Sequence, residues 1–519
     1  MKKNIFKTIV CAACAGVLFT GCELDQFPEG SILESESWEQ MSDATAYNYG
    51  LLSGLRSVSG GSYAYVQELM TDLFNMTQND VTFQKEHGWT FTSTQFNGDG
   101  IWGSNFILIG RANNILNNID KIKVQPGSNE ENTIKDYKGL AHFARAYAYC
   151  NMIPRYCKEY NVNAPGDGLG ASELGLPLVK TIDLNAKSSR STLQQTFDFV
   201  WADIAAADTL MQSFGSLNYP GIHALRCLEA RVCMMQGGTE NWERIIEIAE
   251  ELKELYPLRS DLDAFKNIWL NDSGDETIYQ PAQEAPNEQG QSWGIFKSFD
   301  STNGTDKNPV YSPYYIPSDE HLLALYKTKD YRFKTYFTKT SASRNGAKVY
   351  LNVYILNKFP GDPKLMYSSK YEYYNACKVF RTAELYLLAA ESAYYLGDED
   401  GAKDWVNELR EARGLTQNSD KIKSTGEALL ADIQEEWTRE FVGEGFRLNN
   451  LKRWHLGFTR AKASDPNAGA FQKTAAELVD QTLPDQNVLR VIEPNNMRFV
   501  WEVPAQETDA NPNCQKNWR

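Results

Sequence analysis

Apolar residues recur at helical spacing through most of the chain from Ala44 onward. Each of four stretches places its Ile, Leu, Ala and aromatic residues three or four positions apart, the period of an amphipathic helix. These stretches are 107–119, 136–152, 191–211 and 223–235. Ser191 stands where a helix N-cap is expected. The pattern predicts a mainly α body.

Two segments, 224–255 and 381–414, resemble each other. Each reads as a helix rich in small residues, a Gly-containing acidic turn, and a second helix with an apolar face, which is the plan of a tetratricopeptide repeat. Ala230 and Ala249 in one segment, and Ala390 and Ala402 in the other, would let neighbouring helices approach closely. With two earlier helix pairs, this predicts a tetratricopeptide-like scaffold of about four helix pairs, suited to binding other proteins.

The segment 277–375 differs in character from the rest. It is rich in Pro, Gly, Asn and Ser and holds clustered aromatic residues, and residues 349–356 alternate like a strand. We interpret this segment as an irregular lobe inserted into the helical body, and 464–519 as a second irregular segment that ends the chain.

The amino-terminal residues have the pattern of an export signal. Residues 1–7 are cationic, residues 9–19 form an apolar run too short to span a bilayer, and two small residues then lead to Cys22. A Cys in this position resembles the lipobox of bacterial lipoproteins, although Phe19 stands where Leu is usual. The alternative is an ordinary signal peptide with an incidental Cys22, but no A-x-A site follows. We expect acyl chains (palmitate) on Cys22 to hold the protein at a membrane that it does not cross.

Charge and motifs exclude several functions. The formal charge is −15, and removing the three lysines of the leader leaves −18, so a nucleic-acid partner is not expected. The five histidines are dispersed without ligand spacing, and there is no phosphate-binding loop, dinucleotide fingerprint or nucleophile elbow. We therefore expect no cofactor and no metal.

One stretch, 435–454, has the residue types of an active site. Glu436, Glu440 and Glu444 recur at helical spacing beside several Arg and Lys residues. A carboxylate pair roughly 5–9 Å apart could serve a glycosidase. We favour a structural role, in which arginines pair with these carboxylates and fix one helix to its neighbours.

The same stretch carries a family resemblance. Its R-E-x-x-x-E-G-x-R and L-K-R-W motifs, from Arg439 to Trp454, resemble the carboxy-terminal signature of SusD/RagB proteins. Further matches in the same order are Cys22, Trp102, 111–114, 145–147, 381–390 and 504–518. The resemblance implies a SusD-like fold on the outward face of the outer membrane, a SusC-type TonB-dependent barrel as partner, and nutrient capture without catalysis. Family ligands are mostly oligosaccharides, and RagB-like members take oligopeptides.

A sugar site needs aromatic faces for the apolar side of the rings and amides or carboxylates for the hydroxyls. Two stretches offer both, one near the amino end and one in the irregular lobe, although the same aromatics often attach a long loop to the body. The candidate ligand residues are Trp89, Phe91, Asn97, Trp293, Tyr311, Tyr314 and Tyr315.

Taken together, the sequence predicts a lipid-anchored surface protein that binds glycan fragments and delivers them to a SusC-type transporter. The alternatives are an oligopeptide receptor of the RagB kind and, from another class, a surface glycoside hydrolase that uses Glu440 and Glu444. The predicted organisation is a signal peptide (1–21), Cys22 and a polar tether (22–43), amino-terminal helical repeats (44–276), the ligand-facing lobe (277–375), the last repeat and signature helix (376–463), and a carboxy-terminal segment (464–519).

Overall fold

The structure of the chain is a computed structural model. It describes residues 37–77, 82–92, 94, 99–183, 185–274, 276–290, 292–344, 348–460 and 490–518. The predicted leader, Cys22 and most of the tether lie outside these residues. No helix among the described residues combines the length and the apolar character needed to cross a membrane.

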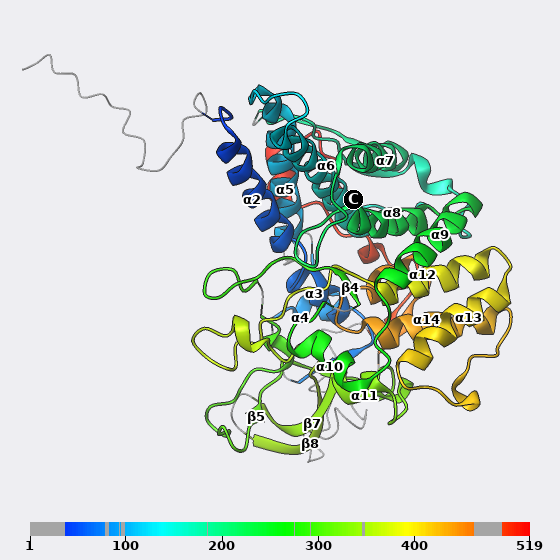
Figure 1. Cartoon of the computed structure of the whole chain (residues 1–519). Helices are drawn as coiled ribbons and strands as arrows, with labels where there is room; N and C mark the ends of the chain where they lie inside the picture. The colour runs from blue at the N-terminus through cyan, green and yellow to red at the C-terminus, as the bar shows by residue number, and fades with distance from the viewer. Residues whose placement is uncertain are drawn as a thin grey trace, which may run out of the picture.

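Four helix pairs form the helical body, the first three in the upper part of Figure 1 and the fourth at the right of the view. They are α2 (Met41–Ser57) with α5 (Asp99–Asn118), α6 (Asn129–Tyr156) with α7 (Leu193–Leu210), α8 (Ile222–Gln236) with α9 (Thr239–Leu255), and α12 (Thr382–Tyr395) with α13 (Glu399–Ala412). Successive pairs also pack on each other, α5 on α6 and α9 on α12. The mainly α, tetratricopeptide-like scaffold is therefore confirmed.

The local signals explain where these helices begin and how closely they pack. Thr192 caps α7 by accepting a hydrogen bond from the Gln195 amide at 3.1 Å. The predicted cap, Ser191, is one residue too early, and its hydroxyl bonds the Leu176 carbonyl instead. Ala249 and Ala390 are fully buried where α9 packs on α12, as small residues at a close helix contact should be.

The signature segment folds as two helices, α14 (Glu427–Phe441) and α15 (Arg447–Arg453), joined by a short turn. Helix α12 lies between α9, α13 and α14, and every residue from Thr382 to Ala393 is buried. A helix covered on all sides carries no amphipathic period, so apolar and small residues occupy every face of α12. Its two buried carboxylates, Glu384 and Glu391, are paired with Arg231 and Arg453.

A second, smaller core lies in the lower part of Figure 1. The helices α3 (Ser62–Leu69), α10 (Leu262–Leu270) and α11 (Tyr331–Tyr336) contribute residues to this core, and α4 (Gln84–Gly88) packs beside α3. Strand β1 (Phe74–Met76) pairs with β6 (Tyr315–Pro317), and β5 (Val310–Tyr311) runs parallel to β7 (Phe337–Arg344), which pairs with β8 (Lys348–Leu356). The pair of β4 (Thr277–Tyr279) and β9 (Phe380–Arg381) belongs to the larger core instead. The predicted strand at 349–356 is thus confirmed as β8. Residues from α3 and α10 complete this core, so the lobe also uses sequence outside 277–375.

The carboxy-terminal segment returns to the first half of the chain. It contributes β11 (Val491–Ile492), which pairs with β10 (Phe458–Thr459), and α17 (Ala505–Ala510), and it lies near β2 (Leu174–Pro177) and β3 (Arg190–Thr192). The Trp501 amide donates to the Arg155 carbonyl at 2.7 Å, and its ring is fully buried beside Tyr156. Asn517 donates to the Tyr156 carbonyl at 2.8 Å and accepts from Arg190 at 2.7 Å. The last residues therefore complete the packing of α6.

Candidate functional site

A buried ion network surrounds the signature helix α14. Glu440 accepts hydrogen bonds from Arg381 at 2.9 Å and from Arg413 at 2.9 and 3.0 Å, and Arg332 lies 3.3 Å away. Arg381 and Arg413 also bind Glu276. These five side chains are essentially inaccessible to solvent. The prediction that arginines pair with the signature carboxylates is confirmed.

The network sets the charge state of Glu440. Burial alone would raise the pKa of this carboxyl, but Arg413 and Arg381, with Arg332, outweigh burial and hold the pKa well below its usual range. A glycosidase acid must keep its proton near neutral pH, which requires the opposite shift. Glu440 is therefore a permanent anion that holds three arginines, and it does not suit the role of a general acid.

The turn after α14 joins the signature to α3. Gly445 has φ +87°, and its amide donates to Glu68 at 2.9 Å. A Cβ at Gly445 would lie 2.8 Å from the Ala64 Cα, so the close contact requires glycine. Arg447 binds Asp72 through two hydrogen bonds of 3.0 and 3.2 Å. The E-G-x-R motif thus fixes the approach of two segments that are about 375 residues apart in sequence.

Glu68, at the centre of this junction, has an unusual titration. Burial raises the pKa of Glu68 to about 7, although the amides of Arg447, Gly443 and Gly445 and the charge of Lys358 act in the opposite direction. Its second carboxylate oxygen has no hydrogen-bond partner among the residues that the structure describes. Such an oxygen favours the protonated form of the carboxyl.

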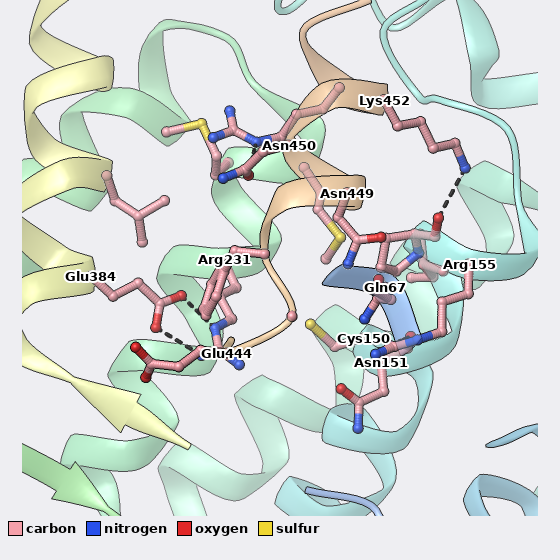
Figure 2. Close-up of a pocket in the computed structure, with 18 of the residues that line it drawn as sticks. Gln67, Cys150, Asn151, Arg155, Arg231, Glu384, Glu444, Asn449, Asn450 and Lys452 are labelled. Carbon is pink, nitrogen blue, oxygen red and sulfur yellow. Dashed lines mark hydrogen bonds and ion pairs between the residues drawn. The ribbon is translucent and has the colours of Figure 1, made fainter. Parts of the chain in front are cut away.

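A central cavity of about 220 Å³ lies between α3, α6, α8, α12 and α15. Figure 2 shows Arg231, Glu384 and Glu444 on one side and Gln67, Asn151, Arg155 and Asn449 gathered on the other. Arg231 binds Glu384 through two hydrogen bonds of 2.5 and 2.7 Å. No single stretch of sequence predicts this cavity, because its lining also includes Phe197 of α7, Trp242 of α9 and Trp437 of α14, so that eight helices far apart in the chain contribute to it.

The predicted ligand residues near the amino end are buried or lie outside the described chain. Trp89 is 0% exposed, donates its indole N–H to the Met70 carbonyl at 2.6 Å, and packs edge-on against Phe499. Phe91 is also 0% exposed, beside Trp518. Asn97 lies outside the described residues. The two buried rings offer no face to a ligand in this conformation, and their ligand role stays a prediction.

The predicted ligand residues of the lobe divide into two groups. Trp293 stacks on Phe359 at 3.7 Å inside the smaller core, and the buried Tyr315 donates its hydroxyl to the Thr82 carbonyl. Tyr311 and Tyr314 are only half-buried. The second pair can therefore reach a ligand without rearrangement of the core, whereas the first pair cannot.

Tyr311 belongs to a cluster that we call the lobe surface: Phe299, Asp306, Tyr311, Lys370 and Tyr371. Phe299 stacks in parallel on Tyr371 at 3.7 Å and bridges to Tyr311 through the backbone. The Tyr371 hydroxyl donates to Asp306 at 2.7 Å, and Lys370 pairs with the same carboxylate. Aromatic faces beside charged and hydroxyl groups can bind a sugar ring. The signal that could have indicated this cluster is the group of three tyrosines between positions 371 and 374, which lies far from Tyr311 in sequence.

Comparison with known proteins gives two matches to family models. Residues 263–518 match the model described as SusD family, and residues 51–216 match the model described as starch-binding associating with outer membrane. A SusD-like protein of Formosa agariphila is 23% identical over 508 residues, which span 87% of this chain and 91% of that protein. The starch-binding protein SusD of Bacteroides thetaiotaomicron is 35% identical over 97 residues, only 19% of this chain and 16% of that protein.

Solved structures share the fold. A SusD superfamily protein from Bacteroides thetaiotaomicron superposes with a TM-score of 0.70 at 21% identity, covering 92% of this chain and 100% of that one. A SusD-like carbohydrate binding protein from Bacteroides vulgatus superposes with a TM-score of 0.68 at 17% identity, covering 92% and 97%. At these identities the likeness concerns the architecture alone.

Proposed function

The chain belongs to the SusD/RagB family, and on that premise we propose that it is a lipid-anchored protein of the outer-membrane surface that binds glycan fragments and delivers them to a SusC-type TonB-dependent transporter. The two family matches carry the proposal, since together they extend over residues 51–216 and 263–518. Lipid on Cys22 would anchor it. The four helix pairs would supply the partner-facing scaffold, and capture would proceed without bond cleavage.

The lobe surface is the contact that we propose for the glycan. Its stacked pair, Phe299 and Tyr371, and the half-buried Tyr311 present rings at the exterior, and Asp306 and Lys370 supply hydrogen-bonding partners for hydroxyls. A ring that already holds its rotamer loses little entropy when a sugar stacks on it. This proposal keeps the assignment of residues 277–375 to a ligand-facing lobe and of residues 44–276 to the scaffold.

A binding experiment tests the site. The purified chain is titrated with starch fragments and with other plant and host oligosaccharides by calorimetry, and Tyr371→Ala is compared with Tyr49→Ala. Tyr49 is 67% exposed and lies on α2, an element that contributes no residue to the lobe surface. We expect Tyr371→Ala to weaken glycan binding about 3- to 30-fold and Tyr49→Ala to leave it unchanged. Equal affinities of the two variants would contradict the proposed contact, and binding only of oligopeptides would favour the RagB-like alternative.

Purification tests the anchor and the partner. The chain, tagged at its carboxy terminus, is extracted from native outer membranes in mild detergent and analysed by mass spectrometry. We expect a co-purifying TonB-dependent barrel, and acyl chains on Cys22 that Cys22→Ala removes. A chain that emerges alone and without acyl groups would refute both. Release of reducing ends from a glycan, abolished by Glu440→Gln and retained by the exposed control Glu435→Gln, would instead support the hydrolase alternative.

A further inference from the structure

The lining of the central cavity holds more cationic than acidic side chains. Six cationic side chains and three carboxylates line it, whereas the whole chain has a formal charge of −15. Two of the carboxylates, Glu384 and Glu444, are already bound by Arg231 and Arg381. Three of the remaining cations, Lys158, Lys378 and Arg453, pair with carboxylates outside the cavity lining, which are Glu173, Asp272 and Glu391. Arg155 and Lys452 are left.

These two cations of the cavity wall have no carboxylate partner among the described residues. Arg155 donates to the backbone carbonyls of Asn151 and Tyr63, and Lys452 donates to the carbonyls of Pro154 and Cys157. Arg155 is 6% exposed and Lys452 is 5% exposed. The remaining carboxylate, Glu159, attracts Lys452 at longer range without forming an ion pair. A buried cation without a counter-charge is costly unless an anion joins it.

Two buried polar atoms at the same wall have no hydrogen-bond partner in the described part of the chain. The Gln67 amide nitrogen donates to the Tyr63 carbonyl at 3.0 Å, the same oxygen that accepts from Arg155 at 2.9 Å, so the two side chains lie together. This bond fixes the orientation of the Gln67 amide and leaves its oxygen without a donor, although Gln67 is only 1% exposed. The Arg155 Nε also lacks an acceptor. Lys452 has three N–H groups and uses two of them.

These groups define the chemistry of an occupant. An acceptor-rich anion would satisfy Arg155 and Lys452, and a donor such as a hydroxyl would satisfy Gln67. Aromatic side chains of Tyr63 and Phe446 supply apolar wall. A dry cavity of about 150 Å³ accommodates benzene, so about 220 Å³ is enough for one substituted six-membered ring.

We propose that the central cavity is a binding site for one small hydroxylated carboxylate, of the size of a single sugar acid, held by Arg155, Lys452 and Gln67. Figure 2 shows Arg155 and Gln67 close together, with Asn449 beside them. The cavity shares no residue with the lobe surface. The inference therefore stands whether or not the lobe surface binds a glycan.

The first test needs no variant. Full-length protein in detergent is titrated by calorimetry with D-glucuronate, D-galacturonate and D-gluconate, and with D-glucuronamide as the neutral counterpart of glucuronate. We expect at least one of the three acids to bind, and the amide to bind about 10- to 100-fold more weakly than glucuronate if glucuronate is that acid. Binding of none of the acids, or equal binding of glucuronate and glucuronamide, would overturn the proposal.

The second test locates the site. Lys452→Met removes a cation from the cavity, and Lys135→Met removes an exposed one from α6 that pairs with Glu131. Asn449→Phe adds a ring to the cavity lining from α15 and leaves both buried cations in the chain, so it serves if Lys452→Met does not fold. We expect Lys452→Met and Asn449→Phe to lower the affinity for the bound acid at least tenfold and Lys135→Met to leave it unchanged. Unchanged binding in a folded Asn449→Phe would place the acid elsewhere and refute the assignment.

Discussion

Replacing Glu440 by Gln tests whether the buried network of the signature helix depends on charge. The carboxylate accepts four contacts from Arg332, Arg381 and Arg413, with N–O distances of 2.9–3.3 Å. Gln keeps one acceptor but turns an N–H₂ group toward arginines that are themselves donors. Breaking a buried pair by removing one partner costs about 3–5 kcal/mol, because the remaining charge stays buried. We expect that loss in the free energy of unfolding.

Urea unfolding, followed by circular dichroism, measures the effect. With a slope of about 3–5 kcal/mol/M for a chain of this size, Glu440→Gln should lower the midpoint by roughly 1 M. The matched control is Glu435→Gln on the same helix, whose side chain is 50% exposed and pairs with Arg439. A solvent-exposed pair contributes about 0.5 kcal/mol or less, so this control should unfold like the wild type.

The pH dependence of the free energy of unfolding provides a second test of the same substitution. In the folded chain the pKa of Glu440 is far below its usual range, whereas in the unfolded chain it returns to the ordinary glutamate value. The unfolded state therefore binds the proton first, and wild-type stability falls as the pH drops below about 5. Glu440→Gln should lack this part of the acid sensitivity. A variant that stays within about 1 kcal/mol of the wild type at pH 7 would refute the charge argument.

Two further predictions concern the junction with α3. Gly445→Ala should destabilise the fold by more than Gly397→Ala in the same urea assay, because both glycines have positive φ but only a Cβ at 445 would meet backbone, at 2.8 Å from the Ala64 Cα. We expect Gly397→Ala to lower the free energy of unfolding by about 1–2 kcal/mol through strain, and Gly445→Ala to lower it by at least 1 kcal/mol more. Equal losses would contradict the steric argument. Burial raises the pKa of Glu68 to about 7, so the free energy of unfolding of the wild type should fall by roughly 3 kcal/mol between pH 4.5 and pH 8, since ionisation is disfavoured in the folded state. Glu68→Gln should not show this fall when its unfolding is measured at pH 5 and pH 8. An identical pH profile in the variant and the wild type would disprove the assignment.

The periodic parts of the fold could be predicted from sequence because their signals are local. The helices α5–α9 and the pair α12–α13 follow from apolar spacing and small residues, and the strand β8 follows from alternation. The sequence could also predict that arginines would pair with the glutamates of α14, because this segment repeats glutamate at helical spacing beside arginine. The partners Arg381 and Arg413 could not be predicted, because they are fixed only when α12 and α13 pack on α14.

The sites could be predicted less well, because exposure is a property of the folded chain. Trp293 and Tyr311 belong to the same aromatic-rich stretch, yet Trp293 is buried against Phe359 and Tyr311 lies at the surface. Residue type alone cannot separate these outcomes. The central cavity was beyond sequence reasoning altogether, since the groups that define it are Gln67, Arg155 and Lys452, and each has an ordinary structural role when considered singly.

The return of the last residues onto α6 has a consequence for biogenesis. A chain synthesised from its amino end makes α6 and its carbonyls at Arg155 and Tyr156 long before Trp501 and Asn517 exist to bind them. The contact between Asp72 and Arg447 imposes a similar delay. Early helices can form, but the native core cannot close until nearly the whole polypeptide has been translated. Under the proposed function, such a chain would reach an export machinery in a form that can still be threaded, and folding would finish after translocation.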